Sequence, residues 1–460
     1  MRWPISIKRI STLAFFAFMS ITFIAFFKTA MELEDAEQAY YSQWFRLVYD
    51  DQPPFYTWLQ IVLNGIFGVN SISFSLLRGI LFSGTLGVVY VFAKERGNGL
   101  NKSRLSVLLL VLMPVFIDFT FRRLSHTTLL CLSVVSTYLV IQRLLKHPST
   151  LNYMFLGILL GLGLMSKYNY AFFIISLFLV SLWDGELRMA IWQRKILVSL
   201  LVFLLMLVPH GYWLMEHAQY QEVLQGSVQE KMNTGLSSNT FSFSPLLNYA
   251  SGLFAMIFLI TAVVVFLLYR KKLEFTKSHS SWLLKLFWVQ LLVMGIFFMA
   301  FQSEKVETRW MLPLFLPFVV LLMESITLKS PAKLISMGFL VFYLAIAIQF
   351  VRTPIEKLFG IPSSVHFGFE PIANKLIQNF PNEEWMLPNV TYGGNIRLLH
   401  PSKKVYASDD YSVILPKVDA HKWIRVSLDT PSKNTQRPLD SIIGFGKEKE
   451  NLYFYKGLGN

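Results

Sequence analysis

The stretch that decides the fold is ISTLAFFAFMSITFIAFF, which runs from Ile10 to Phe27. It contains no charged side chain, and a helix of about 20 mostly apolar residues is long enough to cross a bilayer. Lys8 and Arg9 precede it, as in a signal peptide, but no small-residue cleavage site follows it. We therefore expect it to be an uncleaved first spanning helix.

Apolar runs of similar length recur as far as Phe350, in a chain whose 460 residues are 54% hydrophobic and only 15% charged. Soluble domains carry about 25% charged residues, so the deficit indicates a lipid-facing surface. The sequence predicts an all-α polytopic membrane bundle of about eleven transmembrane helices. The expected spans are 10–28, 72–93, 105–120, 126–142, 151–165, 169–183, 196–214, 249–269, 282–301, 310–328 and 333–351. A shorter apolar segment, at 55–68, is expected to be re-entrant or interfacial.

The positive charges follow a pattern that sets the topology. If the N-terminus is cytoplasmic, clusters of Lys and Arg fall in alternate loops on that side, at 94–104, 143–146, 188–195, 270–277 and 329–333. The first outer loop is acidic instead, and an odd number of spans places the C-terminus outside. Topology thus accounts for the net charge of +14, and no nucleic-acid partner is expected. The single cysteine excludes an internal disulfide and a Cys-based metal cluster.

The composition changes after Arg352, where Pro, Asn, Ser, Lys and Asp become frequent. We expect residues 1–352 to form the transmembrane domain, with the first outer loop at 30–71. Residues 353–460 are expected to form a small α/β domain outside the membrane. Its β-like pieces lie at 404–406, 423–427 and 452–455, and a helical stretch lies near 371–379.

Carboxylates crowd the first outer loop. Four of them stand within six residues, namely Glu32, Glu34, Asp35 and Glu37. The spacing of Glu34 and Glu37 lets these two share a helix face. A carboxylate held near the membrane surface can act as a general base toward a hydroxyl group. The alternative is a solvated acidic loop.

A rigid turn, Asp50-Asp51-Gln52-Pro53-Pro54, follows this loop. The two prolines prevent a helix from continuing through it. Asp51 is therefore presented in a defined place, with Gln52 beside it. The alternative is an ordinary turn before an interfacial helix, and the pattern alone favours neither interpretation.

Cations occur at the predicted outer ends of several spans, where the positive-inside rule disfavours them. They are Arg122, Arg123, Lys167 and Arg309, with His126 at a helix start. Guanidinium and ammonium groups bind phosphate oxygens, so a lipid phosphate is a natural partner. The alternative for Lys167 is that its side chain snorkels to the membrane surface, and the alternative for Arg309 is a charge that only helps to fix the membrane topology. His126 is expected to form a hydrogen bond and not to bind a metal. Topology brings the cations and carboxylates to one face, which suits a reaction on a lipid phosphate.

Seven segments, taken together in chain order, resemble a known family. They are LEDAEQAYYSQW, DDQPPFYTWLQ, RRLSHTTLL, GLGLMSKYNYAFF, LVPHGYWLMEH, ETRWMLPLFLP and GGNIRLLHPSKKVYASDD. All are similar to segments of glycosyltransferase family 39, which includes protein O-mannosyltransferases and enzymes that add aminoarabinose or galacturonic acid to lipid A and core lipopolysaccharide. The resemblance implies a GT-C fold and inverting transfer of a sugar from a polyprenyl-phosphate donor to a lipid or glycan acceptor. It also implies a bacterial inner-membrane protein surrounded by membrane lipids, with a periplasmic C-terminal domain.

The resemblance implies roles for single residues as well. The family usually has Asp-Glu where this chain has Glu34-Asp35, so either can be the base, and Asp35 is ranked first. Asp51 is expected to shape the acceptor or donor site, and Lys167 and Arg309 to contact the donor phosphate. The other residues expected to bind substrate are Glu37, Gln52, Arg122, Arg123, His126 and Tyr168. No cofactor is expected, because Arg and Lys can stabilise the departing phosphate, and a divalent metal is left open.

Two other functions fit a polytopic membrane protein. A transporter or flippase of lipid-linked sugars usually places ionisable residues at the membrane midplane and often has inverted repeats, and neither feature is visible in this sequence. A non-catalytic scaffold for envelope assembly would use residues 353–460 to bind partners. The sequence leaves the sugar and the acceptor open.

Overall fold

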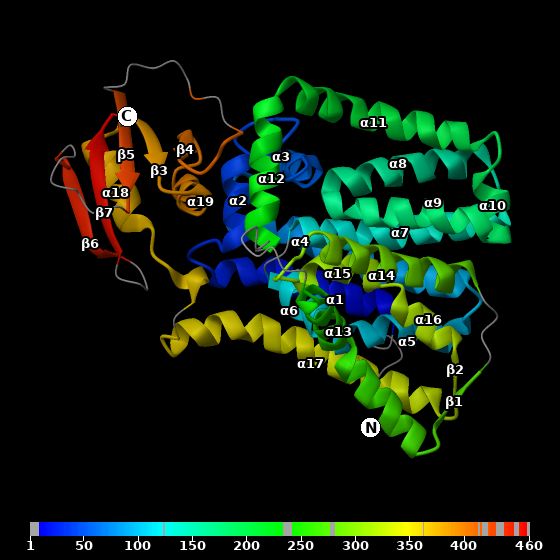
Figure 1. The fold of residues 1–460 in the computed structure, drawn as a ribbon. Coiled ribbons are helices and arrows are strands. Elements are labelled where there is room, and N and C mark those ends of the chain that lie inside the picture. The colour runs from blue at the N-terminus through cyan, green and yellow to red at the C-terminus, as the bar shows by residue number, and fades with distance from the viewer. Residues whose placement is uncertain are drawn as a thin grey trace. The chain divides into compact units, whose positions relative to one another are not determined.

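The computed structural model describes residues 9–122, 125–232, 242–276, 281–361, 363–412, 415, 422–428, 437–445 and 450–457. The chain forms two compact units, each assembled from several segments. The first unit comprises residues 1–20, 51–55 and 78–349, and the second comprises residues 21–50, 56–77 and 350–460. Figure 1 shows the helices and strands from which each unit is built.

Long apolar helices dominate the chain. In the described ranges, seven helical stretches are long and apolar enough to cross a membrane. They are Ile10–Phe27, made of α1 (Ile10–Phe23) and the 3-10 helix η2 (Ile24–Phe27), and then α4 (Ser71–Glu95), α7 (His126–Lys146), α11 (Ile196–Glu216), α13 (Ser244–Tyr269), α14 (Trp282–Ala300) and α17 (Pro331–Leu358). An eighth candidate is Tyr168–Trp183, which contains η4 (Tyr168–Tyr170) and α9 (Ala171–Trp183), followed after a bend of 109° by α10 (Gly185–Ile191). The polytopic helical architecture is thus confirmed.

The remaining expected spans are shorter or interrupted. α8 (Thr150–Ser166) has 17 residues. The run at 105–120 is divided among α5 (Gly99–Leu109), η3 (Leu110–Leu112) and α6 (Pro114–Arg122), and the run at 310–328 between α15 (Thr308–Phe315) and α16 (Phe318–Glu324). Proline disfavours helical backbone at the preceding residue, and Met113, just before Pro114, is accordingly extended, with φ −99° and ψ 98°. The expected number of about eleven spans stays a prediction.

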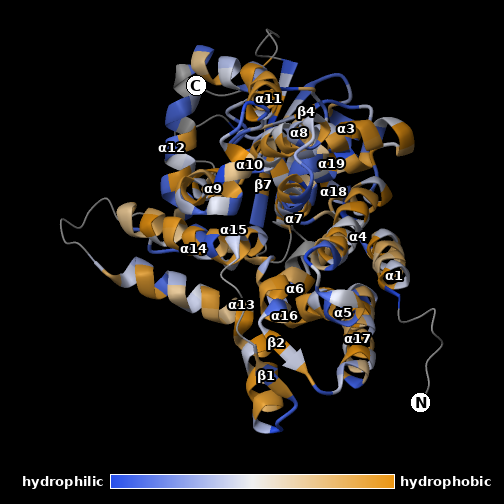
Figure 2. Cartoon of the chain, turned by 90° about the vertical axis from the view of Figure 1, so that its right-hand side faces the viewer, coloured by the Kyte–Doolittle hydropathy of each residue, from blue (hydrophilic) through white to orange (hydrophobic). Residues whose placement is uncertain are grey.

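Small residues let α8 and α11 approach closely, as the glycine-rich sequence of α8 indicates. A Cβ atom added at Gly157 would lie 2.4 Å from the carbonyl oxygen of Ser199, and one at Gly161 would lie 2.9 Å from Sδ of Met206. Elsewhere α11 exposes large apolar side chains. Figure 2 shows apolar residues along most of α11, α13 and α14, which is the surface that lipid requires.

The second unit is built around a five-stranded sheet. In spatial order its strands are β4 (Val405–Ala407), β3 (Glu384–Leu387), β5 (Trp423–Ser427), β7 (Glu450–Lys456) and β6 (Asp440–Phe445). β3 pairs in parallel with β4 and β5, and β7 pairs antiparallel with β5 and β6. α18 (Glu370–Asn379) and α19 (Val390–Leu399) bury apolar residues in the same core (Figure 1). The strands expected near 404–406, 423–427 and 452–455 and the helix near 371–379 are confirmed, whereas β3, β6 and α19 were not predicted.

The first outer loop supplies α2 (Leu33–Tyr41) and most of α3 (Phe55–Phe67) to this second unit. Tyr40 and Tyr41 of α2 share one hydrophobic core with Trp385 of β3 and Ile396 of α19. The helix that carries the candidate base, α2, therefore packs with the C-terminal sheet.

In the first unit, α12 (Ala218–Met232) follows α11, and β1 (Leu273–Phe275) forms a two-stranded antiparallel sheet with β2 (Ile326–Leu328).

Candidate active site

Two of the carboxylates predicted for the site lie at the beginning of α2. Glu34 and Asp35 occupy its first turn, where the positive end of the helix dipole favours negative charge. Glu34 and Glu37 are half-buried, and Asp35 is 1% exposed. Nζ of Lys28 lies 3.6 Å from Oδ2 of Asp35, and both side chains are almost completely buried. A buried carboxylate therefore has a cation beside it, which offsets the cost of removing its charge from water.

The segment before α2 is held by further contacts within the second unit. The hydroxyl of Ser364 donates a hydrogen bond of 2.5 Å to the Glu32 carboxylate. The N–H groups of Thr29 and Ala30 both donate to the carbonyl of Val365, at 2.9 and 3.0 Å. These contacts fix the route of the chain from the first spanning stretch into the acidic helix.

Asp51, in the first unit, accepts hydrogen bonds at both oxygens. Gln52 Nε2 donates to Oδ1 at 2.8 Å, Ser227 Oγ donates to Oδ2 at 2.5 Å, and Lys231 forms an ion pair with Oδ2. Ser227 and Lys231 both belong to α12. Burial alone would raise the pKa of Asp51, but the charge of Lys231 and the three hydrogen bonds outweigh it and lower the pKa. Asp51 thus anchors α12 to the turn predicted from the two prolines.

Lys167, His126 and Tyr168 lie where α8 ends and α7 begins. Nζ of Lys167 donates to Oγ1 of Thr127 at 3.0 Å, and Nδ1 of His126 lies 3.2 Å from the carbonyl oxygen of Ser166. The Tyr168 hydroxyl lies 3.3 Å from Nε2 of His210 on α11.

Arg309 lies in a compact charge cluster before and at the start of α15. It forms an ion pair with Glu307, and Nζ of Lys305 lies 2.9 Å from the same carboxylate. Burial opposes the charge of Glu307, but hydrogen bonds and charges from Lys305 and Arg309 prevail and lower its pKa. The N–H of Lys305 also donates to the carbonyl of Met232 at 3.1 Å. This cluster is therefore joined to the last residue of α12, the helix that contacts Asp51.

The first unit thus connects Asp51 and Gln52, through α12, with the segment that bears Arg309. Glu34, Asp35 and Glu37 belong to the second unit. The side chain of Arg122 and all of Arg123 lie outside the described residues. Across the described ranges, no three His, Cys, Asp or Glu side chains form a group that could hold a metal ion.

Sequence reasoning missed three residues of this arrangement. Lys28 stands at the predicted outer end of the first span, where the positive-inside rule already marked other cations as unusual. Ser227 and Lys231 lie in the polar sequence of α12, and no local pattern connects them to Asp51. The positive-inside rule, which marks cations at outer helix ends as unusual, could have identified Lys28, and no rule used for the sequence could have identified Ser227 or Lys231.

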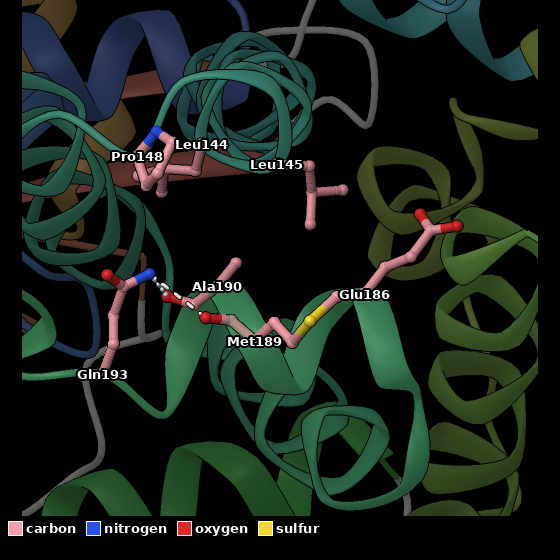
Figure 3. A pocket seen from close by; sticks show the side chains of 7 residues that line it. All are labelled: Leu144, Leu145, Pro148, Glu186, Met189, Ala190 and Gln193. Carbon is pink, nitrogen blue, oxygen red and sulfur yellow. Dashed lines mark hydrogen bonds between the residues drawn. The ribbon is translucent and has the colours of Figure 1, made fainter.

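A cavity of about 210 Å³ lies elsewhere in the first unit (Figure 3). It is lined by Leu144, Leu145, Pro148, Glu186, Met189, Ala190 and Gln193. Gln193 donates hydrogen bonds to the carbonyls of Met189 and Ala190, at 3.1 and 3.2 Å. Its lining comes from the end of α7, the following loop, α10 and the turn after α10, and includes no residue predicted for the active site.

Comparison with known proteins agrees with this architecture. Residues 51–213 match the family described as dolichyl-phosphate-mannose-protein mannosyltransferase. Two proteins of Rhizobium johnstonii are similar in sequence: the lipopolysaccharide core galacturonosyltransferase RgtB, at 29% identity over 191 residues, and RgtA, at 30% over 189 residues. The matches cover 42% and 40% of this chain but only 39% and 37% of RgtB and RgtA, so less than half of each relative is matched.

The fold is similar over nearly the whole chain to a solved structure, that of ArnT from Cupriavidus metallidurans bound to undecaprenyl phosphate. The TM-score is 0.64, and the alignment covers 96% of this chain and 97% of ArnT at 12% sequence identity. At that identity the likeness concerns the fold. The chain is thus similar in sequence, over residues 51–213, to the dolichyl-phosphate-mannose-protein mannosyltransferase family, and in fold, over nearly its whole length, to ArnT.

Proposed function

We propose that the protein transfers a sugar from a polyprenyl-phosphate donor to a lipid or glycan acceptor of the bacterial cell envelope. The names of the two relatives support core lipopolysaccharide as the acceptor and galacturonic acid as the first sugar to test. The undecaprenyl phosphate bound to ArnT supports the class of donor. The observation that carries the proposal is the buried carboxylate of Asp35, with Lys28 beside it, on a helix whose other carboxylates are half-buried.

The proposal includes a topology. The N-terminus is cytoplasmic, residues 1–352 form the membrane domain, and the first outer loop and residues 353–460 are periplasmic. The positive-inside distribution of Lys and Arg supports this orientation. Lys167 and Arg309, which break the rule, are the residues to which the proposal gives a catalytic task.

The reaction is a single displacement with inversion. Asp35 removes the proton from an acceptor hydroxyl, and the hydroxyl oxygen forms a bond to the anomeric carbon of the sugar. The bond from that carbon to the phosphate oxygen breaks, and the polyprenyl phosphate leaves with the electron pair. Lys167 and Arg309 stabilise the negative charge that develops on the leaving phosphate. Glu34, one position earlier, is the second candidate for the base.

Asp51 has a different task in this scheme. Both of its oxygens already accept hydrogen bonds from Gln52 and α12. We assign it to shaping the substrate site by holding α12, and Gln52 contributes by donating to it. Glu37, Arg122, Arg123, His126 and Tyr168 stay proposed substrate contacts.

A deletion strain complemented with variants tests the proposal. The mass added to envelope lipids and glycans is measured by mass spectrometry, together with transfer in membranes supplied with a polyprenyl-phosphate sugar. Removing a general base costs about 10²–10⁴-fold in rate, so Asp35→Asn is expected to lose transfer by at least a hundredfold. The matched control is Glu274→Gln, which removes a carboxylate from an exposed ion pair with Lys329 and should transfer normally.

Full modification by Asp35→Asn, Glu34→Gln and Asp51→Asn alike would contradict the catalytic assignment. Loss in Glu34→Gln with full activity in Asp35→Asn would move the base to Glu34. Movement of a lipid-linked sugar across the membrane without any transfer would favour the transporter hypothesis. If another transferase carries out the modification and needs this chain only as a binding partner, the result would favour the hypothesis of a non-catalytic scaffold.

A further inference from the structure

The acidic helix α2 is held at its beginning by one side chain of α19. The N–H of Met31 donates to Oδ1 of Asn395 at 2.7 Å, and Nδ2 of Asn395 donates back to the carbonyl of Met31 at 3.2 Å. Asn395 is 1% exposed. Leu33, the first residue of α2, has a positive φ of 35°, a strained conformation that persists only where the surroundings fix it. The double contact with Asn395 provides such a restraint two residues earlier.

The end of α2 is held by Arg397, two positions after Asn395 on α19. Its guanidinium donates to the carbonyl of Ala39, to Oγ of Ser42 at 3.0 Å and to the carbonyl of Ser42 at 3.4 Å. The last carbonyls of a helix lack partners within it and attract cations. Burial lowers the pKa of Arg397 to about 10, so it stays charged at neutral pH. Arg397 therefore satisfies backbone groups that the helix itself leaves open.

Between these two contacts the helices touch backbone to backbone. A Cβ atom added at Gly394 would lie 1.9 Å from the carbonyl oxygen of Ala36. Further along α2, the hydroxyl of Tyr40 accepts a hydrogen bond of 3.0 Å from the N–H of Ala407 in β4. The contacts of α19 with α2 thus lie on either side of the turn that carries Glu34 and Asp35. None of these contacts is made with the carboxylate of either residue.

We propose that Asn395 and Arg397 are positioning residues, which set the place and orientation of the acidic helix and thereby of the catalytic carboxylate. This inference rests on the proposed function, in which that carboxylate is the base. It assigns a task to the GGNIRLLH segment that the catalytic scheme leaves unused. The C-terminal sheet then acts in the reaction as the support of the base.

The test compares Arg397→Lys, Arg397→Gln and Asn395→Asp with the wild-type full-length protein in detergent or vesicles. Lysine keeps the charge of Arg397 but loses its fork of donors, and aspartate keeps the acceptor for Met31 but loses the donor. The matched control is Lys375→Gln, which removes contacts of 2.7 and 2.8 Å to Asp440 and Ser441, between α18 and β6.

A displaced base slows the chemical step more than it weakens donor binding. The Arg397 variants are therefore expected to lose at least tenfold in kcat while KM for the polyprenyl-phosphate donor stays within twofold, and Arg397→Lys recovers part of the kcat lost by Arg397→Gln. Hydrogen exchange of the α2 amides is expected to be at least tenfold faster in Arg397→Gln, with β3 and β5 unchanged. Lys375→Gln should leave kcat and α2 exchange at wild-type values.

Wild-type kcat and wild-type α2 exchange in folded Arg397→Gln would overturn the positioning role. So would an equal loss of protection in α2 and in the sheet, because that pattern reports general unfolding. If the wild-type protein transfers no sugar from any donor, the proposed function fails instead. In that case, fast hydrogen exchange confined to α2 in Arg397→Gln still shows that Arg397 holds the helix. Only the inference that this contact matters for catalysis is then refuted.

Discussion

Nζ of Lys28 lies 3.6 Å from Oδ2 of Asp35, and the two side chains are only 1% and 2% exposed. Each charge is thus removed from water, and each has the other as an opposite charge nearby. Breaking a buried pair by removing one partner costs about 3–5 kcal/mol, because the remaining charge stays buried. The pair therefore matters for stability as well as for the proposed chemistry.

Lys28→Met is accordingly expected to destabilise the protein by about 3 kcal/mol. The double variant Lys28→Met/Asp35→Asn, which has no buried charge left at this pair, is expected to recover most of that loss. Thermal unfolding in detergent measures both. The control is Lys329→Met, which removes an ion pair with Glu274 whose side chains are 54% and 62% exposed, and which should cost less than about 1 kcal/mol. Equal losses for Lys28→Met and Lys329→Met would refute the expectation.

Asp51 gives a prediction about acid. Its pKa is lowered in the folded protein, because Lys231, Ser227 and Gln52 outweigh the effect of burial. A carboxylate of this kind stabilises the fold above its ordinary pKa of 3.8, and the contribution is lost as the pH falls through the lowered value. The wild-type protein should therefore melt higher than Asp51→Asn near pH 6, and the difference should shrink at a pH well below 3.8. A difference that stays constant over this range would contradict the ion pair with Lys231.

Asp409 is expected to behave in the opposite way. Burial, together with the negative charge of Asp410, raises its pKa to about 6, although the N–H of Val390 donates to it at 2.9 Å. A raised pKa means that the stabilising contribution is complete below 3.8 and lost as the pH rises through about 6. Asp409→Asn, which imitates the protonated form, should raise the melting temperature at about pH 7.5 and leave it unchanged near pH 4.

Asp440, the first residue of β6, provides the control for this pH dependence. Burial would raise the pKa of Asp440, but hydrogen bonds and charge from Lys375, with help from Ser441 and Asn379, lower it. Asp440→Asn should therefore reduce the melting temperature at neutral pH. The same sign for Asp409→Asn and Asp440→Asn at neutral pH would show that the two environments are not distinguished as described.

The helix contact at Gly394 gives the fourth prediction. Its added Cβ would lie 1.9 Å from the carbonyl oxygen of Ala36, and backbone cannot move away as a flexible side chain does. Overpacking costs about 1–3 kcal/mol, so Gly394→Ala should lower both the melting temperature and the transfer rate. Gly65→Ala, on α3, meets nothing within 4 Å and should be neutral or stabilising by up to about 1 kcal/mol. Equal effects in the two variants, measured by thermal unfolding and transfer, would argue against a close α2–α19 contact.

The sequence predicted the long helices because hydropathy is a local property of each run. It placed α4, α7, α11 and α14 within four residues of their observed bounds, whereas α13 begins five residues before its predicted start and α17 ends seven residues after its predicted end. It did not predict the breaks at 105–120 and 310–328, since proline is only weakly polar and leaves the hydropathy of a run nearly unchanged. The backbone rule for the residue before a proline carried that information at Pro114, whereas Leu316, before Pro317, keeps helical backbone angles.

The sequence predicted which charged residues belong to the candidate site, but it did not predict which residues they contact. Carboxylates before a span and cations at outer helix ends stand out because they conflict with the surrounding pattern. The contacts of Lys231 with Asp51 and of Arg397 with Ala39 join residues far apart in the chain, 180 and 358 positions respectively. Neither periodicity nor composition specifies such pairs, because they depend on tertiary packing.

The bond between Met31 and Asn395 joins residues that are 364 positions apart. At a translation rate of roughly 5–20 residues per second, Asn395 leaves the ribosome roughly 20–70 s after Met31. During that interval the acidic helix exists without the support that fixes its place. On the proposed function, a chain truncated before Asn395 would therefore carry every carboxylate of the first loop and still be inactive, and activity would begin only after Asn395 has been synthesised.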